Sequence, residues 1–411
     1  MSAADSAPDP TIGTAPNPEE EEGLSFGRAM RALARGDLGS VRVLVGIAVI
    51  WTIFQIANDR FLSAINLSNL TLQIAATATI SIGVVLVLLL GEIDLSIGAV
   101  SGLAAGVMAV LTVQHGWPPL LGIFAALGVG LAIGAFNGFI VTQFGVPSFV
   151  VTLAGLLAFQ GALLYVLGDT GLVNLPPSII TDLTSTFFDP VIGWILGILG
   201  IVAIIASLLA VRRRREKAGL EVGAMSGVIV RVVVVAAAIL AAVAILNSDR
   251  GVPLAAVIVV ALMILFTFIT ERTRYGRHIF AVGGNEEAAR RAGISITKIK
   301  ISVFTLASML AAAGGILAAS RLLAVNQQAG SGDVLLLAIA GPVIAGTSLF
   351  GGRGYIWSAL LGAVVIGSIS NGMDLLALES SVKFMVTGGV LLAAVALDAI
   401  GRQRRQAHGR L

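Results

Sequence analysis

The chain of 411 residues contains no cysteine, which excludes disulfide bonds, thiolate metal sites and cysteine nucleophiles. Imidazole can come only from His115, His278 and His408, which lie far apart without metal-ligand spacing, so we expect no metal site. Charge is also scarce: Asp, Glu, Lys and Arg make up 12% of the chain, whereas soluble domains hold about 25%. Because 57% of the residues are hydrophobic, the composition predicts an integral membrane protein.

Sequence signals for enzyme chemistry are absent as well. The chain has no G-x-x-x-x-G-K-[ST] loop, so we expect that it does not bind ATP itself. It has no Ser/His/Asp or His/Glu group at enzyme spacing, and we expect no catalytic residue and no bound cofactor. The basic residues cluster in short loops beside apolar segments, which indicates orientation in a membrane rather than nucleic-acid binding.

Hydrophobic segments recur along the chain, and most reach the roughly 17 to 25 residues that a spanning helix needs. They predict an all-α, polytopic transmembrane helix bundle of about 10–12 helices. The expected segments are 41–57, 72–90, 97–113, 120–142, 149–167, 191–211, 228–246, 252–270, 301–321, 334–350, 356–376 and 382–398.

The distribution of Lys and Arg predicts the orientation of the bundle. Basic residues gather in alternate loops, at 212–217, at 271–300 and at the carboxyl end. The loop 168–190 instead has three aspartates and no Lys or Arg. Since cytoplasmic loops carry the excess of positive charge, we expect both termini in the cytoplasm and the loop 168–190 outside.

The ends of the chain differ from its middle. Residues 1–40 begin with a segment rich in Pro, Ala and acidic residues and end with spaced arginines. This pattern predicts a disordered acidic tail followed by an amphipathic lead-in on the inner membrane face. Residues 401–411 form a basic cytoplasmic tail, and 41–400 are expected to be the transmembrane domain.

The cytoplasmic stretch 271–300 contains a short helix with both ends marked. Asn285 is a suitable N-cap, Glu286 and Glu287 follow it, and Gly293 is suited to the left-handed stop. A helix of about two turns is marginal alone in water, so it must dock. It is either a cap on neighbouring loops or a helix that inserts into a partner protein.

Two polar breaks interrupt the apolar pattern. The first, Gly91 to Ser96, holds Glu92 and Asp94, which are costly in a bilayer unless they face protein, water or the membrane surface. Asp94 is also a suitable N-cap for the next helix, whereas Glu92 has no such local role and is a candidate for the pathway or its gate. The second break, Gly346 to Gly354, is rich in glycine.

Small residues and amides mark close helix packing. Gly98, Gly102 and Gly106, and then Gly130, Gly134 and Gly138, recur every four residues and predict closely packed helices. Asn137 and Asn371 each precede a glycine within an apolar segment, and such amides more often bond across helices than touch a substrate. Similar breaks and Asn-Gly pairs in both halves hint at a repeat.

Several motifs resemble, in order, the permease subunit of ribose/xylose-type ABC sugar importers, and the resemblance extends from about 41 to 400. The extra pair of segments at 191–246 is similar to the xylose-type members. The matching motifs are Gly91-Glu-Ile-Asp-Leu-Ser96, Val146-Pro-Ser-Phe149 with Thr152-Leu153, Thr273-Arg-Tyr-Gly-Arg277 running into Ala281-Val-Gly-Gly-Asn285 and Ala288-Ala-Arg290, and Gly346-Thr-Ser-Leu-Phe-Gly-Gly352 through Asn371-Gly-Met373.

The resemblance implies a multi-pass protein of the bacterial cytoplasmic membrane that imports a monosaccharide, such as D-xylose or another pentose. It implies as partners a second copy of the chain, an ATP-binding subunit that holds Mg-ATP, an extracytoplasmic sugar-binding protein and membrane lipid. It implies a coupling role toward the ATPase for Gly283, Gly284, Asn285, Glu286, Glu287, Ala288, Ala289, Arg290 and Gly293. Candidates for the translocation path or its gate are Glu92, Asp94, Ser96, Asn137, Thr347, Ser348 and Asn371.

One departure from the family pattern is Gly341-Pro342, because a proline there can kink the tenth segment. A different class also fits part of the sequence: an ion-coupled secondary transporter of a small polar solute, with Glu92 or Asp94 as the coupling carboxylate. That alternative gives no reason for the capped helix at Asn285.

Overall fold

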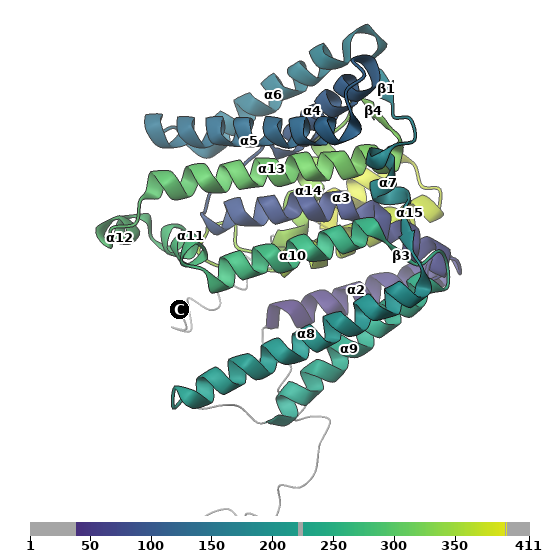
Figure 1. Ribbon diagram of the computed structural model, residues 1–411, viewed down its shortest axis with the longest axis vertical. Helices are drawn as coiled ribbons and strands as arrows, with labels where there is room; N and C mark the ends of the chain where they lie inside the picture. The colour runs from purple at the N-terminus through teal and green to yellow at the C-terminus, as the bar shows by residue number, and fades with distance from the viewer. Residues whose placement is uncertain (1–37, 221–224, 391, 393–411) are drawn as a thin grey trace, which may run out of the picture.

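A computed structural model describes residues 38–220, 225–390 and 392 (Figure 1). The predicted tails at 1–40 and 401–411, apart from residues 38–40, lie outside the described residues. The last predicted segment, 382–398, is described only up to residue 390 and at 392. Within the described part of the chain the fold is an all-α bundle with four very short strands, which confirms the predicted fold class.

Among the described residues, nine helical stretches are long and apolar enough to cross a membrane. They are α3 (Ala64–Leu89), α4 (Ile97–Ala109) with its π-helical extension Val110–Gln114, α5 (Pro119–Phe144), α6 (Ser148–Leu167) with the 3-10 turn Gly168–Thr170, α8 (Pro190–Lys217), α9 (Met225–Asn247), α10 (Leu254–Arg272), α13 (Ile296–Leu322) and α15 (Trp357–Leu375).

The remaining elements are shorter or begin at the edge of the described chain. They are α2 (Leu38–Ala57), α7 (Ile179–Ser185), α11 (Arg274–Gly284), α12 (Glu286–Arg291), α14 (Gly332–Ile344) and the strands β1 (Leu172–Asn174), β2 (Phe187–Phe188), β3 (Val252–Pro253) and β4 (Ala324–Asn326). Residues 380–390 are also helical. A helix therefore overlaps each of the twelve predicted segments.

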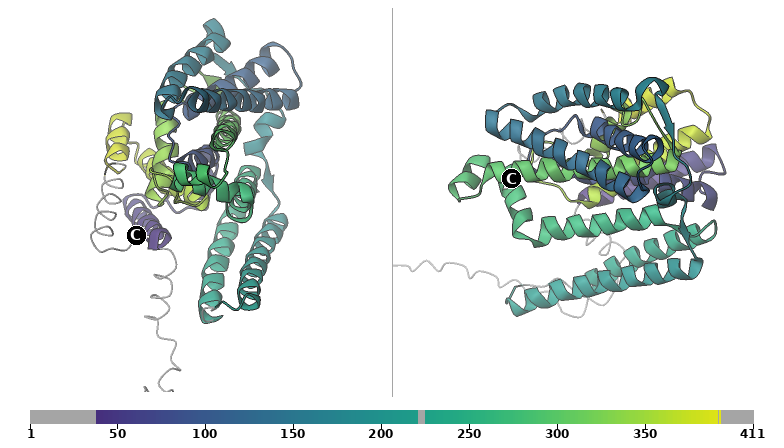
Figure 2. Two further views of the ribbon diagram at one scale, coloured as in Figure 1. Left: turned by 90° about the vertical axis from the view of Figure 1, so that its left-hand side faces the viewer. Right: turned by 45° about the horizontal axis from the view of Figure 1, so that its top comes forward.

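The helix α13 is the centre of the bundle, because it packs against α3, α4 and α5. The helix α3 is almost as central: 83% of an apolar stretch of 18 residues within it is buried, against 6% of the corresponding stretches of α8 and α9. Figure 2 shows the α8–α9 pair at one side of the bundle. Since α8 and α9 are apolar and mostly exposed, their surfaces suit contact with lipid or with another chain.

Glycine spacing explains how closely α5 approaches α13. A Cβ added at Gly130 would lie 2.5 Å from the Ser308 carbonyl oxygen, and one at Gly138 would lie 2.7 Å from Cα of Ile301. The predicted close packing along this stripe is therefore confirmed. In the other stripe, on α4, Gly98 and Gly102 meet the loop residues Gly330 and Ala329, whereas Gly106 meets Leu163 of α6, so this stripe accommodates a loop and a helix.

At two places the expected helix boundaries were clearly wrong. The helix α3 begins at Ala64 behind the cap Ser63, eight residues before the predicted start at 72. The tenth segment, predicted to extend to 350, ends at Ile344, two residues after Pro342. Proline has no amide proton to continue the helical ladder, and the chain turns here, where the Thr347 amide donates to the Pro342 carbonyl at 2.9 Å.

The two ends of the bundle carry different structures. The helices α11 and α12 lie at one end, and α7 with β1, β3 and β4 lies at the opposite end (Figure 1). At the latter end β1 pairs with β4 and β2 pairs with β3, both antiparallel. Ser320 of α13 contacts the α7 residue Thr184 at 2.8 Å and donates to the Thr181 carbonyl at 3.1 Å. The loops 168–190 and 271–300 thus occupy opposite ends, as the predicted alternation requires.

Candidate coupling and translocation site

The helix α12 has the capped form that its sequence predicts. The Asn285 side chain accepts a hydrogen bond from the Ala288 amide at 2.9 Å, and Gly293 adopts φ = +80°. Ion pairs between Arg290 and Glu286, at 3.2 Å, and between Arg291 and Glu287, at 3.1 Å, support the helix along its surface. Because it is so short, its position depends on what it packs against.

One face of α12 is buried and the other is open. Ala289 is buried among core side chains, whereas Glu287, Ala288 and Arg291 are exposed. The contacts of α12 are with α11 and with the start of α13. A docked helix with a free outer face at the end of the bundle has the form of a contact element for another protein.

The preceding helix, α11, was not predicted. Thr273 caps it by accepting from the Gly276 amide at 3.1 Å, and Ile279 and Val282 are buried along one face. The spacing of Tyr275, Ile279 and Val282 behind a threonine was the signal that could have revealed it. The hydroxyl of Tyr275 contacts Ser302 of α13 at 2.8 Å, and burial raises its pKa.

Three glycine-containing stretches that are distant in sequence meet where α11 ends. A Cβ added at Gly351 would lie 2.6 Å from the Gly283 carbonyl oxygen and 2.7 Å from the Gly91 amide nitrogen. A Cβ at Gly283 would collide with the Leu89 carbonyl oxygen at the end of α3. That carbonyl accepts a hydrogen bond from the Gly352 amide at 2.9 Å. We call Gly91, Gly283, Gly351 and Gly352 the glycine junction; it brings both polar breaks against the end of α11 in the stretch 271–300.

The first polar break is held by the beginning of α6. Ser148 accepts from the Ile93 amide at 3.2 Å, and Thr152 accepts from the Leu95 amide at 3.0 Å. Backbone groups that lack helical partners are costly away from water, so these hydroxyls stabilise the interruption. The motif around Val146-Pro-Ser-Phe149 and Thr152 therefore fastens the break to α6.

Asp94, Ser96 and Asn137 form a buried polar cluster. Oδ1 of Asp94 accepts from the Ser96 amide at 2.8 Å and from its hydroxyl at 2.6 Å, and Asn137 of α5 donates to the same hydroxyl oxygen at 3.1 Å. Asp94 is 4% exposed. Burial raises the pKa of Asp94, and the bonds from Ser96 only partly oppose this. The break thus faces protein, with Asp94 as a local organiser of the start of α4.

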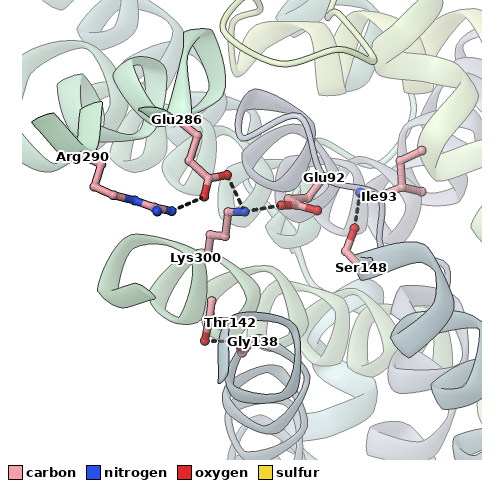
Figure 3. A network of polar contacts seen from close by, with 8 residues as sticks. All are labelled: Glu92, Ile93, Gly138, Thr142, Ser148, Glu286, Arg290 and Lys300. Atoms are coloured by element: carbon pink, nitrogen blue, oxygen red, sulfur yellow. Dashed lines mark hydrogen bonds and ion pairs between the residues drawn. The ribbon is translucent and has the colours of Figure 1, made fainter. Parts of the chain in front are cut away.

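Glu92 belongs to a different network, centred on Lys300 of α13 (Figure 3). Nζ of Lys300 lies 2.7 Å from Oε1 of Glu92 and 2.8 Å from Oε2 of Glu286, and Glu286 also binds Arg290. The hydrogen bond from Lys300 lowers the pKa of Glu286, although partial burial opposes it. A single ammonium group therefore joins the first break, α12 and α13. Lys300 was not among the predicted site residues, since nothing local in its sequence distinguishes it from Lys298.

The second break is stabilised from within. Thr347 is buried, and its hydroxyl contacts that of Ser358 at 2.6 Å. The hydroxyl of Tyr355 donates to the Ala345 carbonyl at 2.7 Å, and Ser348 accepts from the Phe350 amide at 3.1 Å. These bonds shape the turn that presents Gly351 to the glycine junction.

Asn371 lies apart from the other candidate path residues. It exchanges two hydrogen bonds with Asn66 at the start of α3, at 2.8 and 3.1 Å. The structure therefore brings Glu92 together with the residues assigned to coupling, and Asp94 together with Ser96 and Asn137, and places Thr347 and Ser348 in the turn beside them. Within the described ranges, no group of three or more His, Cys, Asp or Glu side chains could hold a metal ion.

A family model described as "Branched-chain amino acid transport system / permease component" matches residues 66–395. The chain belongs to this family of membrane permease components and is a multi-pass membrane protein. A permease component is not an enzyme, and it is one part of a larger transport system.

Curated relatives cover almost the whole chain. The xylose transport system permease protein XylH of Haemophilus influenzae is 37% identical over 88% of this chain and 96% of its own length. The protein of the same name from Escherichia coli is 38% identical over 88% and 92%. The ribose import permease protein RbsC of Bacillus subtilis is 30% identical over 86% and 91%. No solved structure shows a significant match.

Proposed function

We propose that the chain is the membrane-spanning permease subunit of an ATP-binding cassette importer for a monosaccharide, and that the sugar is D-xylose or another pentose. The observation that carries this proposal is the 38% identity to a xylose permease over 88% of the chain. The family description names amino acids, whereas these relatives are named for sugars. We therefore take the cargo from the relatives that match most of the chain.

The proposed partners follow from this assignment. Two copies of the chain surround the path, an ATP-binding subunit supplies the energy, and a sugar-binding protein delivers cargo at the end that carries α7 and the strands. The helix α12 is the contact with the ATP-binding subunit. Its buried Ala289 and its exposed Glu287, Ala288 and Arg291 support this role, because a docked helix with a free face suits insertion into a groove.

The candidate path residues also suit a neutral cargo. A sugar needs hydrogen-bonding groups without strong charge, and the carboxylate of Glu92 is paired with Lys300. Asp94, Ser96, Asn137, Thr347, Ser348 and Asn371 already have partners within the chain. Their proposed part in transport is therefore to shape the breaks and their movements.

The test is purification of the tagged chain from its native membrane together with the proteins that accompany it. We expect an ATP-binding subunit to co-purify, and to be lost when residues 287–293 are replaced by a Gly/Ser linker. Replacement of the exposed, mostly basic segment 213–217 by a similar linker serves as the control and should leave the complex intact. Reconstituted with its partners, the complex should take up xylose only with ATP. Ion-driven uptake by the chain alone would instead establish a secondary transporter.

A further inference from the structure

Lys300 occupies a position that neither the family match nor the capped helix explains. Its side chain is 13% exposed and that of Glu92 is 17% exposed, so their contact at 2.7 Å is largely shielded from water. The same Nζ reaches Glu286 of α12 at 2.8 Å. A shielded ion pair loses much more free energy when one partner is removed than an exposed pair does.

The two carboxylates that bind Lys300 come from separate elements of the chain. Glu92 lies in the break after α3, and Glu286 lies in the first turn of α12 (Figure 3). Both face the same ammonium group, so without Lys300 two negative charges would confront each other. Since like charges in such a site repel, the contact between α12 and the break depends on the lysine.

The glycine junction is a second connection between the stretch 271–300 and the first break. It holds the end of α11 against the end of α3 and against the turn of the second break, backbone to backbone. Neither contact involves long flexible side chains that could absorb a displacement. A movement of α11 and α12 must therefore displace the first break or disrupt these contacts.

We propose that Lys300 couples the movement of α12 to the polar break at Glu92, and so couples ATP hydrolysis on the partner to passage of the sugar. Lys300 is a positioning residue: it acts by holding two elements together and contacts no substrate. The inference rests on the proposed function, and it adds the connection between the contact surface and the path.

The decisive measurement is the number of sugar molecules transported per ATP hydrolysed by the reconstituted complex. In Lys300→Met we expect ATP hydrolysis to persist while this ratio falls about tenfold, which reflects loss of a shielded charge contact. Lys300→Arg keeps the charge and should retain a ratio within about twofold of the unmodified protein. Lys298→Met, on the exposed side of the same helix turn, is the matched control and should leave the ratio unchanged.

Glu92→Gln is a second variant that tests the inference even if Lys300→Met does not fold. It preserves the size of the side chain and leaves the pair between Lys300 and Glu286 in place. It should lower the ratio as Lys300→Met does while the complex assembles normally. A normal ratio in Glu92→Gln or in Lys300→Met would overturn the inference. Absence of ATP-dependent uptake by the unmodified complex would instead overturn the proposed function, so the two failures are distinguishable.

Discussion

Asn66 and Asn371 exchange two reciprocal side-chain hydrogen bonds, at 2.8 and 3.1 Å, and so join the first turn of α3 to α15. Both side chains are buried, and Asn66 donates in addition to the Phe61 carbonyl. Asn371→Ala should lower the free energy of unfolding by about 1 kcal/mol, because it leaves the amide of Asn66 partly unpaired.

A double-mutant cycle measures this pair directly. We expect Asn66→Ala and Asn371→Ala to be non-additive, with a coupling energy of roughly 0.6–1.7 kcal/mol, as found for interhelical hydrogen bonds in membranes. The measurement is reversible unfolding in detergent micelles. Strictly additive effects would show that the two amides act independently.

Gly283 and Gly284 offer a test of the glycine junction within one helix turn. Gly283→Ala places a methyl group against the Leu89 carbonyl oxygen, whereas nothing lies within 4 Å of a Cβ at Gly284. Gly283→Ala should therefore destabilise the folded protein by about 1–3 kcal/mol and reduce uptake. Gly284→Ala should leave the stability unchanged; equal losses of stability in the two variants would contradict the close contact.

The approach of α5 to α13 can be tested in the same way. A Cβ at Gly134 would collide with the Phe304 carbonyl oxygen, whereas Gly128 of the same helix has open space around it. We expect Gly134→Ala to lower the unfolding temperature and to reduce the free energy of unfolding by about 1–3 kcal/mol. Gly128→Ala should leave it unchanged or raise it slightly, because alanine favours the helix by roughly 0.5–1 kcal/mol.

Asn285 tests the dependence of the proposed contact on the helix cap. Asn285→Ala removes the acceptor for the Ala288 amide and should destabilise α12 by about 1 kcal/mol. Since the helix is marginal, recovery of the ATP-binding subunit in the purification should fall. Asn285→Asp preserves the cap and should restore recovery; equal recovery with all three residues would show that the cap does not matter for the contact.

Glu286 gives the Lys300 network a defined pH dependence. Its pKa lies below the ordinary value of 4.5, chiefly because Lys300 donates to its carboxylate. The folded protein thus binds a proton at Glu286 less readily than the unfolded chain does. The stabilisation of the folded protein by ionised Glu286 is therefore present above about pH 4.5 and is lost as the pH falls through the lowered pKa. Arg290 and Glu92 are the other charged groups in the network, and they remain in place in the comparison.

The measurement is the difference in unfolding temperature between the unmodified protein and Glu286→Gln. We expect it to be constant from pH 8 to about pH 5 and to shrink below pH 4.5. A difference that is unchanged well below that range, or absent at neutral pH, would show that Glu286 contributes nothing as an anion.

Local sequence signals were sufficient for several parts of this structure. The twelve apolar segments predicted the helices because a spanning helix needs a long apolar run wherever it lies in the bundle. The cap Asn285, the acidic first turn and Gly293 predicted α12 because helix ends are determined by residues within a few positions. The order of several motifs was sufficient to indicate the family to which the chain belongs.

Other features were visible only in the tertiary structure. The choice of Lys300 over Lys298, the meeting of Gly91, Gly283 and Gly351, and the anchoring of the first break by Ser148 and Thr152 all join residues distant in the chain. The early start of α3 and the end of α14 likewise depend on neighbours, since a short polar or proline-containing stretch is compatible with either helix or turn. Composition and spacing determined that this chain is a helical membrane protein, and the order of its motifs indicated a permease. Packing alone decided which charges and which glycines connect the end that carries α11 and α12 to the interior of the bundle, because such contacts leave no periodic trace in the sequence.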